Sequence, residues 1–243
     1  MGGIGGSVRC ASVLALALGL SGCGVAVVTA PSPAPVEQPT EWAMTPEQAA
    51  RSFERVVQAV EPVAEEECRR RTVGANCDFR IGVDTRPYVP ANAYQTVDDA
   101  GRPVVIFTIA LIASVQNADE LAFVMGHESA HHIAGHLDRQ RINAEAGAVI
   151  FGELASLTGG GARDVATAQE LGAEIGARTY SKEFELEADE LGTIITYHAG
   201  FDPMLGAAFF ARIPDPGDQF LGSHPPNAAR LEAVARTMRG LKG

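Results

Sequence analysis

His127-Glu128-Ser129-Ala130-His131 is the stretch that decides the fold of this chain, because it has the form H-E-x-x-H. Two histidines four positions apart lie on one face of a helix, about 40° apart around the axis and about 6 Å apart along it. Both imidazoles can therefore reach one tetrahedral zinc ion, while Glu128 addresses a water molecule at the open position. The motif occurs by chance in about one chain in a hundred, so its surroundings must support it.

The residues before the motif predict the helix that carries it and a sheet beside it. Asn117 followed by Glu120 resembles an asparagine-led capping box, which opens a helix. The β-rich runs Phe79–Val83 and Pro103–Thr108 predict a small antiparallel sheet. We expect strand Pro103–Thr108 to align an extended substrate at the sheet edge. The expected fold class is α+β, mostly α.

A tetrahedral site needs a third protein ligand, and one arrangement takes it from the same segment. The pattern H-E-x-x-H-x-x-G-x-x-H needs glycine at 134 and histidine at 137, whereas this chain has Gly135 and His136. On a straight helix His136 would point about 180° away from His127. We therefore interpret His136 and His132 as surface histidines or as side chains that support a ligand.

The other arrangement takes a carboxylate from a second helix, within Ser181–Asp189. Glu185 and Asp189 are four positions apart and share one helical face. If Glu185 binds zinc, Asp189 lies one turn away, where it can accept a hydrogen bond from a ligand imidazole and fix its tautomer. Glu183 and Glu187 point elsewhere and are interpreted as solvated charges.

Length and composition predict one main folded domain. The 243 residues are 46% hydrophobic, enough to bury one good core. A formal charge of −11 without a concentrated basic patch argues against nucleic-acid binding. Four prolines make residues 23–44 an extended tether. The domain itself is expected to cover residues 45–243.

The N-terminal residues predict export and lipidation. An apolar run that follows Arg9 is too short to span a bilayer and is typical of a signal peptide. Leu20-Ser21-Gly22-Cys23 resembles a bacterial lipobox, so we expect residues 1–22 to be removed and Cys23 to carry a lipid anchor. An ordinary cleaved signal is the alternative. Gly24, in place of aspartate, favours the periplasmic face of the outer membrane.

The two remaining cysteines predict a disulfide. Cys10 belongs to the signal peptide and Cys23 to the anchor, which leaves Cys68 and Cys77 in an oxidising compartment. Zinc ligation by this pair is the alternative, and the lack of histidine close by in the sequence disfavours it.

Residues 142–180 are rich in small side chains, and Gly159-Gly160-Gly161 is interpreted as a hinge between two helices. The apolar residues of the first helix, among them Val149 and Leu154, are interpreted as ordinary helix packing, with contact to a membrane as the alternative. Further helices are expected at about 182–199, 203–212 and 226–239.

With these motifs the chain resembles the membrane-associated zinc metallopeptidases of family forty-eight, which include the CAAX prenyl proteases, the HtpX heat-shock proteases and the mitochondrial OMA-type proteases. The shared features are H-E-x-x-H, the pattern S-[RK]-x-x-E-x-x-A-D from Ser181, Gly200–Pro203, and Ser223–Pro226 followed by Arg230. The predicted anchor and the expected lack of transmembrane helices favour the LoiP/BepA-like periplasmic branch.

The resemblance implies a gluzincin-type zinc peptidase domain that holds one Zn²⁺ per chain. Its implied metal ligands are His127, His131 and Glu185, and its implied catalytic base is Glu128. In BepA-like members the histidine of the S-H-P motif can cap the metal. His224 is therefore either a fourth, regulatory ligand or a loop histidine.

The function implied is that of a zinc-dependent endopeptidase of the cell envelope, which cleaves misfolded or misassembled periplasmic and outer-membrane proteins. Its expected partners are polypeptide substrates, the membrane through Cys23, and the outer-membrane assembly machinery. The alternative is an assembly chaperone or scaffold with a structural or silenced zinc site. A zinc-dependent amidase of the cell wall has no support beyond the compartment.

Overall fold

The structure is a computed structural model that describes residues 44–179, 181–215 and 224–243. The predicted signal peptide, the predicted lipidation site Cys23 and all but the last residue of the predicted tether lie outside the described residues. Among the described helices, none combines the length and the apolarity that a membrane crossing requires.

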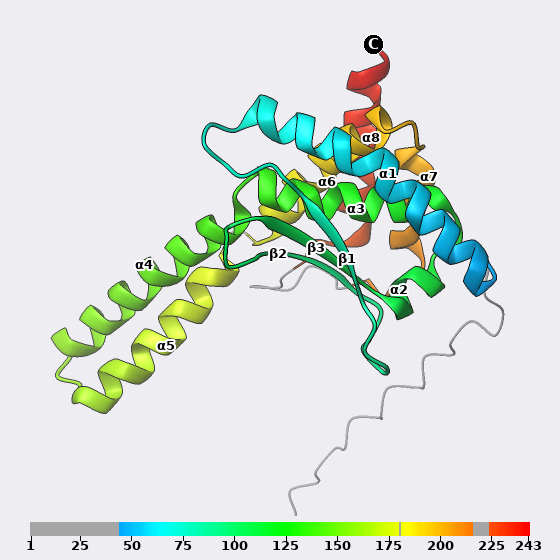
Figure 1. The fold of residues 1–243 in the computed structure, drawn as a ribbon. Helices are drawn as coiled ribbons and strands as arrows, with labels where there is room; N and C mark the ends of the chain where they lie inside the picture. The colour runs from blue at the N-terminus through cyan, green and yellow to red at the C-terminus, as the bar shows by residue number, and fades with distance from the viewer. Residues whose placement is uncertain (1–43, 180, 216–223) are drawn as a thin grey trace, which may run out of the picture. The chain divides into compact units, whose positions relative to one another are not determined.

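Helices dominate the described residues, and a small sheet accompanies them (Figure 1). The helices are α1 (Pro46–Arg71), α2 (Ile109–Ser114), α3 (Ala118–Ile133), α4 (His136–Leu157), α5 (Ala162–Arg178), α6 (Ser181–His198), α7 (Pro203–Ala207), the 3₁₀ helix η1 (Ala208–Ala211) and α8 (Asn227–Lys242). The strands are β1 (Arg80–Asp84), β2 (Ala93–Val97) and β3 (Pro103–Thr108). The expected α+β, mostly helical class is confirmed.

The sheet is mixed, which corrects the expectation of an antiparallel one. Within the described residues its strand order is β1-β3-β2, with β2 antiparallel to β3 and β1 parallel to β3. The turn Asp98–Gly101 joins β2 to β3, and Gly101 has the positive φ of 73° that glycine accommodates best. Because this hairpin occupies one side of β3, β1 pairs with the other side. The chain reverses once before β2 and again after it, so β1 and β3 run the same way.

The strand predicted to align the substrate at the sheet edge, β3, is the central strand. β3 pairs on both sides and has no free edge, whereas β2 pairs only with β3 among the described strands. β2 escaped prediction because it is short and its side chains Gln95 and Thr96 carry little hydrophobic signal. Among the described strands, β1 and β2 are the edges of the sheet, so an extended peptide can pair with β2 but not with β3.

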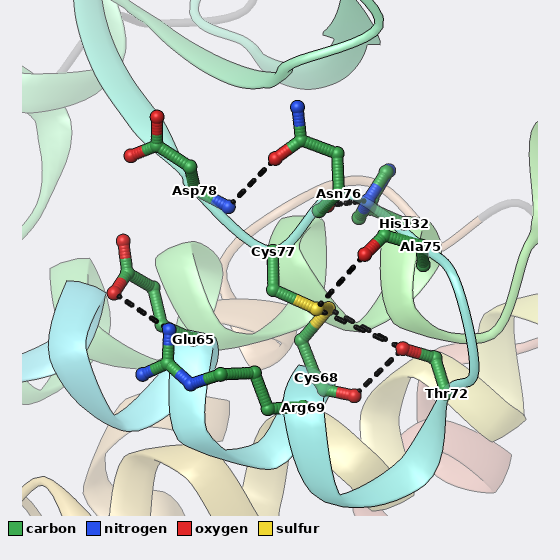
Figure 2. The surroundings of a disulfide bond; sticks show 9 residues. All are labelled: Glu65, Cys68, Arg69, Thr72, Ala75, Asn76, Cys77, Asp78 and His132. Atoms are coloured by element: carbon green, nitrogen blue, oxygen red, sulfur yellow. Dashed lines mark hydrogen bonds and ion pairs between the residues drawn. A yellow bond between two sulfur atoms is a disulfide. The ribbon is translucent and has the colours of Figure 1, made fainter.

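Helix α1 begins with a capping box and ends at a disulfide. The hydroxyl of Thr45 accepts a hydrogen bond from the amide of Gln48, whose side chain accepts one from the amide of Thr45. At the other end of α1, the predicted disulfide Cys68–Cys77 is present (Figure 2). In the loop that it closes, the carbonyl of Asn76 lies 2.8 Å from Nε2 of His132. The disulfide thus fixes the approach to β1 against α3.

Helix α3 is the centre of the core and crosses α6 through two glycines. It packs against α1, α6 and α7, and it buries Leu121, Phe123 and Met125 completely. A Cβ atom at Gly126 would lie 2.8 Å from the carbonyl oxygen of Gly192. A Cβ atom at Gly192 would lie 2.8 Å from the amide nitrogen of His127. Larger side chains would push the helices apart, so this crossing sets the position of His127 relative to α6.

Helices α4 and α5 form a hairpin, as the glycine triplet predicted, and run side by side (Figure 1). Residues 158–161 connect them. Their backbones approach closely because a Cβ atom at Gly147 or at Gly172 would collide with the carbonyl group of the other glycine. The tight contact therefore depends on small residues.

The aliphatic side chains of α4 are not packed as expected. Val149 is 63% exposed and Leu154 is 58% exposed, while the close contact with α5 passes through Gly147 and Phe151. They belong to an exposed stripe on α4 made of Ile142, Val149, Ile150, Leu154 and Leu157.

Candidate metal centre

Three of the predicted ligands meet where α3 crosses α6. Nε2 of His127 lies 3.1 Å from Nε2 of His131. The carboxylate of Glu185 lies 3.6 Å from the first of these atoms and 3.3 Å from the second. The one group of metal-ligating side chains found among the described residues consists of these three. The spacing along each helix and the glycine crossing between the helices together produce this convergence.

The geometry fits a tetrahedral zinc ion. Ligand atoms bound at about 2.0–2.1 Å in tetrahedral geometry lie about 3.3 Å apart. The three separations, 3.1, 3.3 and 3.6 Å, bracket that value. Two imidazoles and one carboxylate are a donor set of catalytic zinc sites, which keep a fourth position open. The residues present can therefore hold the metal that their pattern predicts.

Glu185 is held in the charged form that a metal ligand needs. Burial opposes its ionisation, but hydrogen bonds with His127, His131 and His224 outweigh burial and keep the pKa of Glu185 well below its usual range. A bound cation would take over this stabilisation of the ionised carboxylate from the three imidazoles.

Glu128 lies beside the ligands without joining them. It lines a cavity of about 630 Å³ together with His127, His131 and Glu185. Burial raises the pKa of Glu128, and the neighbouring imidazoles oppose that rise. A carboxylate with a raised pKa is a stronger base, so its position and its basicity both suit proton transfer in the cavity.

Asp189 holds His127 as the i, i+4 spacing predicted. Its carboxylate oxygen lies 2.9 Å from Nδ1 of His127, and its side chain is fully buried. Burial disfavours the charged imidazole, but hydrogen bonds with Asp189 and Glu185 outweigh burial and raise the pKa of His127 to about 10. The contact at Nδ1 leaves Nε2 directed at the other ligands.

Arg230 is a buried cation at this site to which the sequence assigned no role. Its guanidinium donates hydrogen bonds of 2.7 and 2.8 Å to Asp189 and stacks 3.8 Å above the ring of Phe210. The side chain is 6% exposed and also lines the cavity. A signal did exist: on the buried face of α8, Arg230 lies in line with Val234 and Met238, and a buried arginine requires a charged partner.

His136 lies closer to the site than a straight helix allows. α3 ends at Ile133, and Gly135, with a φ of +65°, turns the chain into α4. His136 therefore swings back, and its Nδ1 lies 2.8 Å from Nδ1 of His131. Glu187, interpreted from the sequence as a solvated charge, lies 3.2 Å from the other ring nitrogen of His136. Glu187 is exposed, as that interpretation implies, but it also pairs with the buried His136, which the sequence did not indicate.

His224 lies at the edge of the site. Its Nδ1 is 3.1 Å from a carboxylate oxygen of Glu185, and its side chain is 55% exposed. It therefore contacts a predicted ligand from the open side of the cavity but is not one of the three converging groups. Whether it acts as a fourth ligand stays a prediction.

A comparison with protein families agrees with the geometry. The model of Peptidase family M48 matches residues 51–238, which is most of the chain and includes both helices of the site. No curated protein matches the sequence. Members of this family are metal-dependent peptidases, typically with zinc. With the match and the convergence of His127, His131 and Glu185, the chain belongs to Peptidase family M48 and is a metallopeptidase.

Proposed function

We propose that this protein is a zinc-dependent endopeptidase that uses Glu128 as its general base. The observation that carries the proposal is the convergence of His127, His131 and Glu185 on one point, with Glu128 facing the same cavity. A zinc ion held there would polarise the scissile carbonyl group and lower the pKa of the attacking water.

The chain's own residues supply the rest of the mechanism. Glu128 takes the proton of the attacking water and passes it to the leaving amine. Asn92 and Ala93, at the start of β2, line the cavity, so a peptide that pairs with the free edge of β2 enters the cavity directly. Asp189 keeps His127 oriented, and Arg230 balances the charge of Asp189.

The cellular setting is part of the proposal and rests on the sequence. The lipobox-like Leu20–Cys23 supports an anchor at Cys23 on the periplasmic face of the outer membrane. The disulfide Cys68–Cys77 is in keeping with an oxidising compartment. Misfolded or misassembled envelope proteins are the substrates that we propose, in the manner of the LoiP/BepA-like branch.

Cleavage of casein by purified residues 24–243 tests the proteolytic mechanism. Glu128→Gln should lower the rate by about 100- to 10,000-fold, because it removes the base and leaves the ligands in place. Zinc content should not change. Glu145→Gln, on the exposed surface of α4, is the matched control and should keep full activity. Cleavage that survives Glu128→Gln would refute the mechanism.

A second candidate function is that of an assembly chaperone or scaffold whose site is silenced. The contact between His224 and Glu185 favours it, because a side chain at that position can close the open side of the cavity. His224→Ala should then raise the cleavage rate of the zinc-loaded protein. If His224→Ala and the wild type both leave casein intact while binding zinc, the scaffold is the better description.

A further inference from the structure

A chain of side chains runs from the ligand His131 away from the cavity. Nδ1 of His136 faces Nδ1 of His131 at 2.8 Å, and Nε2 of His136 faces a carboxylate oxygen of Glu187 at 3.2 Å. Arg139 donates a 2.7 Å hydrogen bond to the same oxygen of Glu187. These contacts lie on the side of His131 opposite its converging Nε2, and the mechanism does not use them.

The order of donors and acceptors in this chain fixes one tautomer. An ionised carboxylate only accepts, so Nε2 of His136 carries the hydrogen toward Glu187. In the neutral ring, Nδ1 of His136 is then an acceptor, and the hydrogen between the two rings must belong to Nδ1 of His131. A neutral His131 then presents the lone pair of Nε2, the atom that faces His127 and Glu185, to a bound metal ion, whereas without the metal Nε2 faces the Glu185 carboxylate as a donor. If His136 donated to His131 instead, the hydrogen of a neutral His131 would lie on Nε2, where a metal ion must bind.

The ring of His136 is also held in place by packing. It is 4% exposed and stacks on the ring of Phe184, with centroids 4.6 Å apart and planes 11° from parallel. The guanidinium of Arg139 covers Phe184 at 4.2 Å from the centroid. Because Phe184 directly precedes Glu185, the same packing couples the chain of contacts to the carboxylate ligand.

We propose that His136 and Glu187 are positioning residues that hold His131 in its metal-binding tautomer and orientation. The inference rests on the proposed zinc site and adds two residues that support it. Side chains that orient a ligand histidine typically contribute 10- to 100-fold in metal affinity. α4 therefore contributes to the metal site through its first turn, although it supplies no ligand.

Zinc affinity, measured by competition with a chromophoric chelator, tests the proposal. His136→Phe keeps an aromatic ring against Phe184 but removes the acceptor, and it should weaken zinc binding by about 10- to 100-fold. Glu187→Gln should weaken it in the same direction. His136→Asn, which places an amide oxygen where Nδ1 lies, should restore part of the affinity. Glu183→Gln, on the same helix with the same change of charge, is the matched control.

A second measurement reads the tautomer itself. In the zinc-loaded wild type, ¹H–¹⁵N correlation spectra of the imidazoles should show the His131 hydrogen on Nδ1, held in its hydrogen bond to His136, and Glu187→Gln should speed the exchange of that hydrogen with water. Unchanged zinc affinity in both His136→Phe and Glu187→Gln would overturn the proposal. If His136→Phe does not fold, Glu187→Gln and the spectra decide. A wild type that binds no zinc would refute the proposed function instead, so the two failures are distinguishable.

Discussion

Among the described helices, two pairs pack through glycines that face each other, and the two contacts differ in what surrounds them. Where α3 meets α6, Gly126 and Gly192 bring the backbones together inside the core, directly beside His127. Where α4 meets α5, Gly147 and Gly172 do the same in a hairpin. The first pair surrounds its crossing with buried ionisable groups, whereas α4 bears an exposed aliphatic stripe.

The difference shows that glycine packing sets distances but not chemistry. In α3 and α6 the close approach brings imidazoles and a carboxylate within bonding range of one ion. In α4 and α5 it builds a compact arm that meets the site only at its base, through His136 and Arg139. Matched substitutions in the two pairs should therefore have different consequences.

The largest contrast is expected for buried and exposed ion pairs. Arg230→Met removes one of the two charged partners of the buried Asp189 carboxylate and leaves only His127, and it should lower the free energy of unfolding by about 3 kcal/mol. Arg141→Met on α4 removes an exposed pair with Glu145 and should cost at most about 1 kcal/mol. Urea denaturation measures both. Equal losses would contradict the assignment of Arg230 to a buried network.

The next largest effect is expected when a glycine at either helix contact is replaced by alanine. Gly192→Ala and Gly172→Ala should each destabilise the protein by about 1–3 kcal/mol, because the new methyl group meets backbone atoms. Only Gly192→Ala should also weaken zinc binding, since its methyl group displaces His127. Thermal unfolding and zinc titration of both variants check this. A weakened zinc affinity in Gly172→Ala would show that the hairpin and the site are not separable.

Zinc affinity should depend on pH, and the proton on His127 should set this dependence. Its pKa of about 10 means that the metal-free protein carries a proton there at neutral pH, which zinc must displace. Affinity should therefore fall by about tenfold for each pH unit below that value. Gly172→Ala should show the same slope. An affinity independent of pH between 7 and 9 would contradict the raised pKa.

The proton on His127 should also make the free energy of unfolding of the metal-free protein depend on pH. The folded pKa of His127, about 10, lies above its ordinary value of 6.5. The contribution of the protonated His127 to the free energy of unfolding is therefore complete below pH about 6.5 and is lost as the pH rises through about 10. Denaturation of the metal-free protein at pH 7 and pH 10 measures the loss.

The smallest effect is expected on the exposed stripe of α4. Leu154→Ser removes a side chain that is 58% exposed, so its effect on unfolding should stay within about 0.5 kcal/mol, and zinc affinity should not change. A loss of several kcal/mol in denaturation would show that Leu154 is packed in solution.

Local spacing was enough to predict most of the site. H-E-x-x-H and the i, i+4 pair of Glu185 and Asp189 each define a helical face, and Asn117 marks where the first helix begins. The sequence predicted which face of α3 and which face of α6 carry the ligands. It did not predict that the two helices cross there, because that crossing depends on contacts between residues far apart in the chain. The family resemblance, rather than periodicity, linked Glu185 to the two histidines.

The sequence did not predict where helix α3 ends, which strands pair in the sheet, or which buried group pairs with Arg230. His136 was placed by extending a straight helix, although Gly135 stops α3 two residues after Ile133 and redirects the chain. The parallel pairing of β1 arises from the order of strands across the sheet, which local β propensity does not contain. Arg230 needed a buried partner, and only the fold shows that the partner is Asp189.

The zinc content of the protein shows whether His127, His131 and Glu185 bind a metal ion together. Protein loaded with zinc and then dialysed is measured by elemental analysis, as the wild type, as Glu185→Ala and as the neighbouring control Glu183→Ala. We expect one zinc ion per chain in the wild type and the control, and none retained by Glu185→Ala. A folded wild type without zinc, or a Glu185→Ala variant that keeps the full content, would contradict it.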